Sequence, residues 1–111
     1  MNNCIFCKIA NKELEADMLQ ESEQAVIFKD IRPSAPVHYL VVPKKHLSSI
    51  KEVSHENEAL LGHMVLMAKE AAEKLGLTGY KLVFNVGRDG GQIIDHIHLH
   101  LLGGWKNGQN N

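Results

Sequence analysis

The sequence has almost no net charge and no long apolar run, and each shortage excludes a class of protein. Twelve Lys and Arg face 13 Asp and Glu, so the formal net charge of −1 provides no basic field to attract nucleic acid. No apolar run approaches the ~20 residues that span a bilayer. Residues 1–4 lack the charged-then-apolar layout of a signal peptide. We therefore expect a cytoplasmic protein without nucleic-acid or membrane partners, in which the two cysteines are thiols or metal ligands.

The composition is that of one folded domain. The chain has 111 residues, of which 44% are hydrophobic and 23% charged, which excludes disorder and allows a core of its own. No repeat, low-complexity segment or linker divides it. We expect a single domain over 1–111, with a core at about 4–104 and a short polar tail at 105–111.

Hydrophobic patterning predicts an α+β fold. Apolar residues at steps of three and four predict a long helix over 54–75, with Ser54 as N-cap and Gly76 just after its end. A short helix or turn is predicted at 4–11. β-Branched and aromatic runs predict strands at 18–21, 25–30, 38–42, 81–86 and 97–102. The short connections favour antiparallel pairing.

Histidine is the residue in excess, with seven in the chain and three of them within 96–100. On a strand, alternate side chains point to opposite faces, so His96, His98 and His100 share one face. Three interpretations are open. The histidines can be a chance feature of a half-exposed strand, a metal site formed by histidine alone, or a catalytic group in which one imidazole is a nucleophile and its neighbour assists.

The glycine-rich loop just before these histidines favours the catalytic interpretation. Gly87, Gly90 and Gly91 carry no side chain, so we expect their N–H groups to be free to approach an anion. Such a loop is weak evidence alone, because most glycine-rich turns only connect strands. Next to a histidine row, it predicts a phosphate site beside a nucleophile.

A second constellation is the C-x2-C pair of Cys4 and Cys7. In a reducing compartment this spacing suits a tetrahedral metal, but one pair supplies only half of the ligands. Two buried thiols are the alternative. A redox pair is less well supported, because the cysteines do not follow a predicted strand of a βαβ unit.

Residues 96–102 follow the pattern His-φ-His-φ-His-φ-φ, where φ is apolar, at every position. With the blocks at 28–31, 35–38, 42–46, 60–63, 85–87, 90–92 and 103–104, the sequence resembles the histidine triad (HIT) family and its Hint branch of nucleotide-binding hydrolases. The resemblance covers about 4–104. It implies a five-stranded antiparallel sheet with one long and one short helix. It also implies a homodimer with a ten-stranded sheet, in which Met64, Met67 or their helix neighbours take part.

The resemblance implies roles for individual residues. His98 is expected to attack the α-phosphorus of a nucleotide and form a covalent nucleotidyl-histidine intermediate, which water then hydrolyses. His100 is expected to stabilise the phosphate charge, with His96 and His38 as the other catalytic histidines. The binding residues implied are Asp30 at the ribose hydroxyls, Ile31 against the nucleoside, Asn85 with the backbone of Gly91, Gln92 and Ile93 at the phosphate, and Ile5, Phe6, Ile9 and Phe28 around the base. Core packing is the alternative for the last four residues, and a solvated turn is the alternative for Asp30.

Some relatives with this N-terminal cysteine pair bind structural zinc through two Cys and two His. The matching set here is Cys4, Cys7, His46 and His96. Zinc on His96 would anchor the N-terminal segment to the last strand. The alternative is two buried thiols beside an unligated His96.

The resemblance implies a purine nucleoside phosphoramidase that cleaves the phosphorus–nitrogen bond of AMP or GMP derivatives. A dinucleoside polyphosphate hydrolase and a zinc-stabilised nucleotide-binding interaction module are the alternatives. Two departures affect specificity. Ile93 stands where eukaryotic Hint members carry a serine, so a side-chain hydroxyl contact is lost, and we expect an altered leaving-group preference or rate. The tail at 105–111 is shorter and more polar than Hint tails, which reach toward the partner's site.

Overall fold

The computed structural model describes residues 3–106, so residues 107–111 of the predicted tail lie outside the described part of the chain. Two α-helices, five strands and three 3-10 turns follow one another along these residues. Their order is α1 (Ile5–Ala10), β1 (Met18–Glu21), β2 (Ala25–Lys29), β3 (Val37–Pro43), η1 (Ile50–Glu52), η2 (His55–Asn57), α2 (Glu58–Lys74), β4 (Tyr80–Val83), η3 (Arg88–Gly90) and β5 (Leu99–Gly103).

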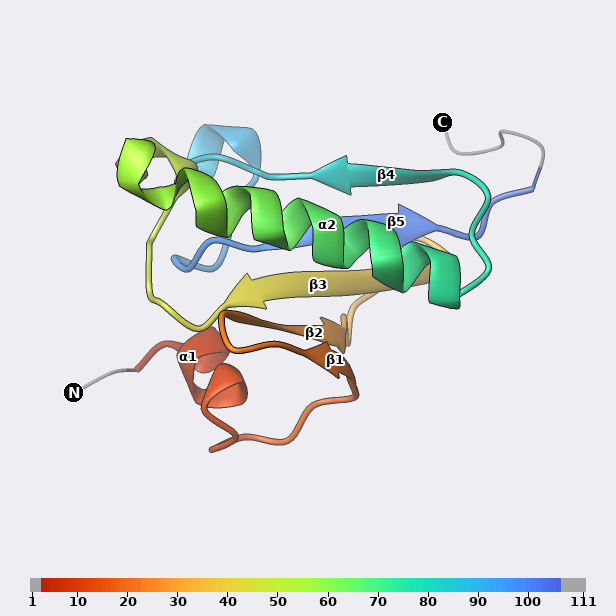
Figure 1. Ribbon diagram of the computed structural model, residues 1–111, viewed down its shortest axis with the longest axis horizontal. Helices are drawn as coiled ribbons and strands as arrows, with labels where there is room; N and C mark the ends of the chain where they lie inside the picture. Colours follow the sequence, from red (N-terminus) through yellow and green to blue (C-terminus); the bar gives the residue numbers. More distant parts are fainter. Residues whose placement is uncertain (1–2, 107–111) are drawn as a thin grey trace.

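The five strands form one antiparallel sheet in the order β1-β2-β3-β5-β4 (Figure 1). The last strand of the sequence therefore lies inside the sheet, between β3 and β4, where its side chains are flanked on both sides. In this register Leu40 of β3 and Val83 of β4 both lie opposite His100. The predicted α+β class, with a five-stranded antiparallel sheet and one long helix, is confirmed.

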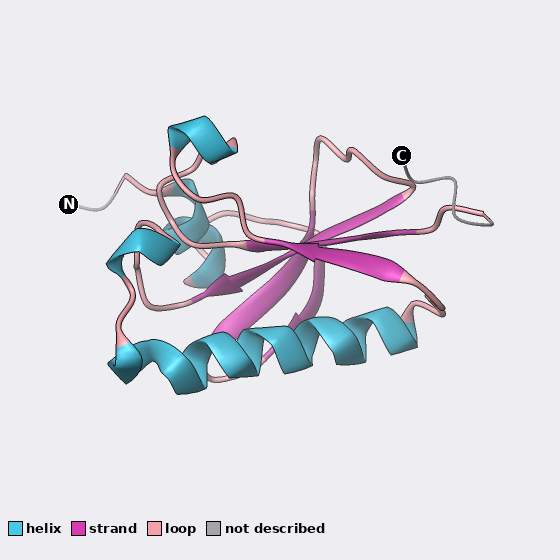
Figure 2. Cartoon of the chain, turned by 90° about the horizontal axis from the view of Figure 1, so that it is seen from above, coloured by secondary structure: helices cyan, strands magenta, loops and turns pink. Residues whose placement is uncertain are grey.

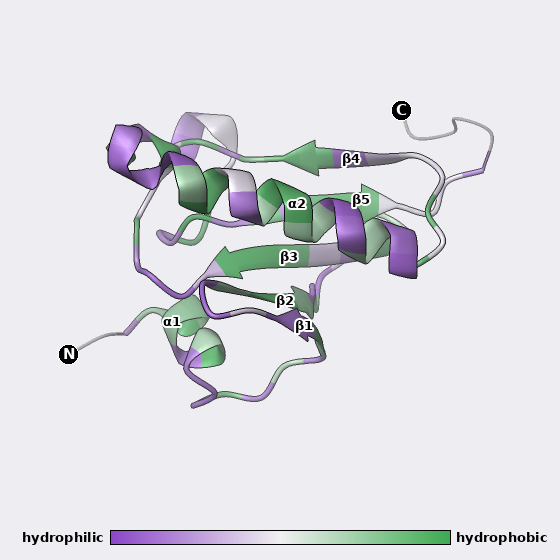
Figure 3. Ribbon diagram, in the orientation of Figure 1, coloured by the Kyte–Doolittle hydropathy of each residue, from purple (hydrophilic) through white to green (hydrophobic). Residues whose placement is uncertain are grey.

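Strand alternation divides the core between the two faces of the sheet. On one face, Ile27, Val41 and Leu101 pack against the buried side of α2, which lies lengthwise along the sheet (Figure 2). On the other face, side chains such as Phe28 and Leu40 pack against α1. The hydrophobic colour along much of β3 in Figure 3 reflects a strand that is buried on both sides. Removing this apolar surface from water is the main stabilising term of the fold.

The long helix begins later than the sequence pattern predicts. Ser54 caps a 3-10 turn, in which its backbone N–H donates to Asn57 Oδ1 at 3.0 Å, and α2 starts at Glu58. At the other end, Gly76 follows the helix with φ of +73°, the left-handed geometry expected after a helix terminus. None of the described helices is both long and apolar enough to cross a lipid bilayer.

Of the residues expected at a dimer contact, Met64 and Met67 do not reach the surface, which leaves the alternative of their helix neighbours. Both side chains are buried in the core of their own chain, because they lie on the side of α2 that faces the sheet. The exposed apolar residues of this helix are their neighbours Val65 and Leu66.

The last two strands are shorter than predicted. β5 begins at Leu99 rather than at residue 97, because the Ile97 N–H leaves the sheet ladder and donates to the Leu47 carbonyl at 2.7 Å. β4 ends at Val83, opposite His100, rather than at residue 86. His96 and His98 therefore precede the strand on which the sequence pattern places them.

Two isoleucines test how the sheet is stabilised. Ile27 is 0% exposed within the α2-side core, whereas Ile31 is 89% exposed. We expect Ile27→Ala to lower the free energy of unfolding by about 2–5 kcal/mol, because it leaves a cavity in a close-packed core. The control Ile31→Ala should change it by less than about 0.5 kcal/mol. Urea denaturation measures both values, and equal losses would contradict this assignment of the core.

Candidate functional site

A cleft of about 650 Å³ opens on the face of the sheet that carries α1. Segments far apart in the sequence form its walls: α1, the ends of β2 and β3, the loops around residues 14–16, 30–34 and 85–94, and β5. Of the residues expected at a nucleotide site, the cleft is lined by Ile5, Phe6, Ile9, Phe28, Asp30, Ile31, His38, Asn85, Gly91, Ile93, His98 and His100. Gln92 and His96 are not part of this lining.

One end of the cleft is apolar. Phe6, Ile9 and Phe28 are each less than 8% exposed and belong to the core on this side of the sheet, and they also line the cleft. The ring of Phe6 meets that of Phe28 edge to face, with centroids 5.6 Å apart. These residues therefore belong both to the core and to the cleft wall, because the cleft borders this core.

His98 is buried, and a backbone contact fixes its tautomer. Its Nδ1 lies 2.8 Å from the carbonyl oxygen of His96. A carbonyl only accepts hydrogen bonds, so Nδ1 of a neutral ring carries the hydrogen and Nε2 keeps its lone pair. Burial lowers the pKa of His98 below its ordinary value of 6.5, which favours this neutral form. His98 thus has the two properties of a nitrogen nucleophile, a lone pair and no charge.

In His100, unlike His98, Nε2 carries the hydrogen and is a donor. The Ser34 backbone N–H donates to His38 Nδ1 at 3.0 Å, so a neutral His38 carries its hydrogen on Nε2. His38 Nε2 lies 2.9 Å from His100 Nδ1, which accepts that hydrogen and leaves the His100 hydrogen on Nε2. Two neighbouring imidazoles, with ring centroids 4.9 Å apart, therefore present a lone pair on His98 and a donor on His100.

Burial keeps the rings of His100 and His38 neutral around pH 7. Burial, reinforced by the neighbouring His98 and His38, lowers the pKa of His100 to about 4. Burial also lowers the pKa of His38, although the Asp30 carboxylate opposes this shift. The group is therefore neutral around pH 7, which the alternation of donor and acceptor nitrogens requires.

Polar side chains flank the histidines along the cleft. Asp30 accepts a hydrogen bond from the Arg32 N–H at 2.8 Å through Oδ1, and its Oδ2 lies 3.4 Å from His38 Nε2. This carboxylate is held in the cleft wall and is not a freely solvated turn residue. On the other side, Asn85 Nδ2 lies 3.5 Å from His100 Nε2.

The glycine loop has a different role from the one expected. The N–H groups of Gly90 and Gly91 donate to carbonyls within the loop, and the Gly87 N–H donates to Gln92 Oε1 at 3.0 Å. These amides are therefore not free for an anion. The φ angles of +73° at Gly87 and +90° at Gly91 show why glycine is needed, since other residues rarely adopt this geometry. Among the described residues, the amide of Ile93 donates no such bond.

Gln92 holds this loop in place from inside. Its Nε2 donates to the carbonyls of Ser48 at 2.6 Å and Ile94 at 2.9 Å. Its own backbone N–H donates to the Gly87 carbonyl at 3.0 Å. Gln92 is 3% exposed, so it fixes the loop around Gly91 and Ile93 without facing the cleft.

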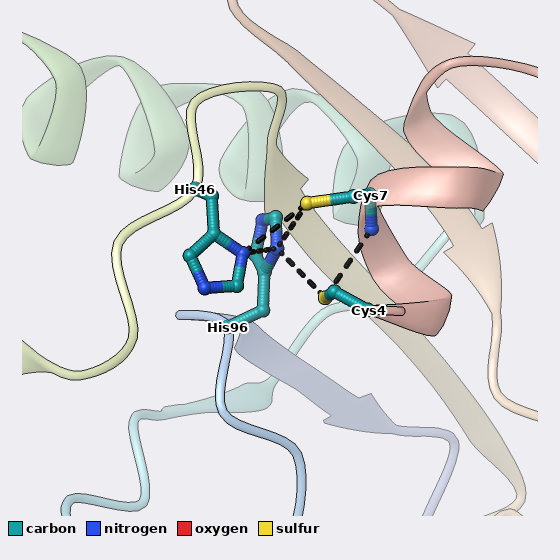
Figure 4. A group of neighbouring side chains, drawn as sticks. All are labelled: Cys4, Cys7, His46 and His96. Carbon is teal, nitrogen blue, oxygen red and sulfur yellow. Dashed lines mark hydrogen bonds between the residues drawn. The ribbon is translucent and has the colours of Figure 1, made fainter. Parts of the chain in front are cut away.

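A second cluster lies behind the cleft, where Cys4, Cys7, His46 and His96 converge from three segments (Figure 4). Their potential ligand atoms all lie within 4.8 Å of one another. The two Nδ1 atoms are 3.1 Å apart, and Cys7 Sγ lies 3.2 and 3.4 Å from them. A tetrahedral zinc ion with ordinary bond lengths separates two nitrogens by about 3.3 Å and a nitrogen from a sulfur by about 3.6 Å. The expected set of four is thus brought together with nearly these spacings.

The tautomer of His96 also suits a metal ligand. Its Nε2 donates to the Pro43 carbonyl at 2.8 Å, so Nδ1 keeps its lone pair and points at the cysteines. Burial lowers the pKa of His96 to about 4, against the favourable effect of that carbonyl. The three histidines expected on one face therefore lie at two places. His98 and His100 line the cleft, whereas His96 belongs to the metal cluster.

The remaining histidines have structural contacts. His63 Nε2 lies 2.8 Å from Ser22 Oγ and ties α2 to the β1–β2 turn, and His55 pairs with Glu58 at the surface. Sequence reasoning missed Ser34, whose backbone amide sets the His38 tautomer, because a backbone hydrogen bond leaves no residue-type signature. It also missed the loop residues Leu14 and Ala16 in the cleft wall, since no pattern links them to the site.

Comparisons with known proteins agree with this geometry. A family model described as scavenger mRNA decapping enzyme C-term binding matches residues 3–110. Protein HitA of Neisseria gonorrhoeae is 47% identical over 104 residues, which cover 93% of this chain and 97% of HitA. A HIT family hydrolase from Legionella pneumophila has a structure with a TM-score of 0.92 at 46% identity, over 97% of this chain and 98% of its own. A zinc-bound histidine triad family protein from Mycobacterium smegmatis has a TM-score of 0.82 at 30% identity, over 97% and 78% of the two chains.

The buried rings make stability depend on pH. The pKa of His100 is about 4 in the folded chain and 6.5 ordinarily, so the unfolded chain binds more protons between these values. The contribution of His100 to the free energy of unfolding is therefore fully present above pH 6.5 and is lost as the pH falls toward 4. We expect His100→Gln to remove about 1 kcal/mol of the loss measured between pH 7 and pH 5, since solvent screens a half-buried ring.

Urea denaturation at a series of pH values measures this difference. The control is His55→Gln, whose fully exposed side chain contacts the surface carboxylate of Glu58 and should change the pH dependence by less than about 0.5 kcal/mol. A His100→Gln curve parallel to that of the parent protein would contradict the assignment.

Proposed function

Because the chain belongs to the histidine triad (HIT) family, we propose that it is a nucleotide-binding hydrolase that cleaves the phosphorus–nitrogen bond of purine nucleoside 5′-phosphoramidates. The observation that carries the proposal is the contact between His98 Nδ1 and the His96 carbonyl. It leaves the Nε2 lone pair of His98 available in the cleft, beside a neighbouring imidazole that is a donor.

In the first step, the His98 Nε2 lone pair attacks the α-phosphorus. The new nitrogen–phosphorus bond forms as the bond to the amine breaks, and the amine leaves after taking up a proton from solvent water. The Nε2–H of His100 donates to a phosphoryl oxygen as its negative charge develops, which lowers the barrier. Asn85, 3.5 Å from this nitrogen, adds a second donor at the same point.

In the second step, water attacks the nucleotidyl-histidine. The new oxygen–phosphorus bond forms as the bond to His98 Nε2 breaks, the attacking water gives a proton to solvent, and the nucleoside monophosphate leaves. His98 returns to its neutral form, with its Nδ1–H still donating to the His96 carbonyl. Dividing the reaction in this way replaces one difficult substitution by two easier ones. The lowered pKa of His98 supports the first step, because a protonated ring has no lone pair with which to attack.

The rest of the cleft suits a nucleoside. Asp30 is positioned to accept hydrogen bonds from ribose hydroxyls, and Ile31 lies beside it in the cleft wall. Phe6, Ile9 and Phe28 offer an apolar wall for a purine ring. Of the backbone amides expected at the phosphate, those of Gly91 and Gln92 are already used within the loop, which leaves that of Ile93 for the ligand.

We also propose that Ile93 affects the leaving-group preference. Its side chain is 80% exposed and lines the cleft on the side of the glycine loop. It offers an apolar surface where a serine would offer a hydroxyl, so the group bound there cannot gain a hydrogen bond from this side chain.

We propose further that Cys4, Cys7, His46 and His96 hold a structural zinc ion. Their spacing, the His96–Pro43 contact and the zinc-bound relative support this assignment. Zinc would supply a crosslink that joins the start of α1, the loop after β3 and the segment before β5. Thiol ligands are retained in a reducing compartment, which is consistent with the predicted cytoplasmic location.

A homodimer is part of the same proposal. β4 is an edge strand of the sheet, and its Leu82 is exposed on the face that α2 covers. Val65 and Leu66 are exposed on α2 itself. Pairing of two β4 edges would satisfy their unpaired backbone groups and cover this apolar surface, giving a ten-stranded sheet.

The test of the activity is hydrolysis of adenosine 5′-phosphoramidate. We expect His98→Ala to lower kcat/KM at least about 10³-fold, because the nucleophile is lost, and His55→Ala to leave it unchanged. Quenching in alkaline denaturant during turnover, which preserves a phosphorus–nitrogen bond, should trap one nucleotidyl group on the parent protein and none on His98→Ala, as measured by mass spectrometry. Faster hydrolysis of diadenosine polyphosphate would favour the second enzyme, and AMP binding with no turnover of either substrate would contradict an enzymatic role.

The test of the metal site is analysis of protein purified without added zinc. We expect about one zinc per chain, and substantially less in Cys7→Ser, because that substitution removes a thiolate ligand. His63→Gln, which changes a histidine outside the cluster, should keep the full content. A stoichiometry well below one in the parent protein would reject the site.

A further inference from the structure

The short helix α1 contributes to two sites at once. Cys4 caps its first turn and Cys7 lies within it, so this helix carries two of the four members of the metal cluster. Ile5, Phe6 and Ile9 of the same six-residue helix line the cleft. A change in the position of α1 therefore moves ligands at one site and walls at the other.

Phe6 lies between the two sites. Its ring meets that of His96, in the metal cluster, edge to face at 6.1 Å, and that of His98, in the cleft, at 5.0 Å. The ring is 7% exposed and also packs on Phe28 at 5.6 Å. It has little room to move without displacing one of the two histidines, because close-packed side chains transmit displacements to their neighbours.

α1 depends on contacts outside itself. Six residues are too few for a helix that is stable in isolation. Its buried side chains Phe6, Ile9 and Ala10 belong to the smaller core on its own face of the sheet, and the larger core under α2 contains none of them. A crosslink at Cys4 and Cys7 therefore orders this helix, while the rest of the fold has a core that does not need it.

From this arrangement we infer that metal binding and nucleotide binding are coupled through α1, with Phe6 as the positioning residue; the inference rests on the proposed function. With zinc bound, the wall formed by α1 is already ordered, so a nucleotide does not bear the entropic cost of ordering it. A bound nucleotide that packs on this wall in turn holds the two thiols toward their histidines. Linkage requires the two effects to be equal in size.

The experiment measures both directions on the full-length protein. Calorimetric titration gives the AMP affinity of zinc-loaded and zinc-stripped protein, and competition with a chelator gives the zinc affinity with and without saturating AMP. We expect AMP to bind at least about fivefold more tightly to the zinc-loaded protein, and zinc affinity to rise by the same factor with AMP. Circular dichroism of the stripped protein should retain the signal of the sheet and α2.

Two matched substitutions test the path of the coupling. Phe6→Leu removes the ring that touches both His96 and His98, so the coupling factor should fall to near one. Phe28→Leu is the control: Phe28 lines the cleft and packs on Phe6, but its side chain is not part of the metal cluster. It should weaken AMP binding equally in both zinc states and so keep the factor of the parent protein.

Each alternative result overturns the inference in a recognisable way. Equal AMP affinities with and without zinc reject the coupling, yet leave phosphoramidate hydrolysis and its His98 dependence in place. Absence of AMP binding in both states, or of zinc binding, rejects the coupling together with the corresponding part of the proposed function. Loss of the whole circular dichroism signal on zinc removal shows global unfolding rather than a local link through α1. A Phe6→Leu protein that keeps the full factor removes Phe6 from the path.

Discussion

A neutral imidazole has one hydrogen for two nitrogens, and the site depends on where each hydrogen lies. Backbone groups decide this for three rings. The Pro43 carbonyl accepts a hydrogen bond from His96, and the His96 carbonyl accepts one from His98. The Ser34 amide donates to His38 Nδ1, which places the His38 hydrogen on Nε2. Since backbone groups do not titrate, they impose one tautomer on each ring for as long as the ring stays neutral.

Burial and sheet register keep this arrangement in place. Burial lowers the pKa of each of these rings, so the neutral forms on which the tautomers depend are the stable ones around pH 7. The pairing of β3 with β5 brings His38 Nε2 to 2.9 Å from His100 Nδ1. A slip of one residue in this register would turn His100 toward α2 and break the chain of donors. The core that fixes the register is therefore part of the arrangement proposed for catalysis.

The glycine loop reaches the cleft at Gly91, but its glycine amides are not free to bind an anion as the sequence suggests. A glycine-rich segment beside a nucleophile suggests an anion cradle, but here the amides of Gly90 and Gly91 already donate to carbonyls within the loop. The glycines supply the positive φ angles that let the chain turn tightly. Gln92 then ties the turn to Ser48 from inside the protein. The loop therefore contributes part of the cleft wall and the backbone amide of Ile93.

By itself, the sequence determined the elements and the chemistry of the residues. The three- and four-residue periodicity before Gly76 predicted the long helix, and the alternation of histidine with apolar residues predicted a strand with a polar face, because local periodicity reflects which side of an element is buried. The grouping of Cys4 and Cys7 with His46 and His96 came from family resemblance. Tertiary structure decided between the two places expected for His96, which faces the cysteines while His98 and His100 face the cleft, and it alone placed Met64 in the core. The physical reason is that these outcomes depend on backbone partners distant in sequence, such as Leu47 for Ile97 and Pro43 for His96, which no local pattern encodes.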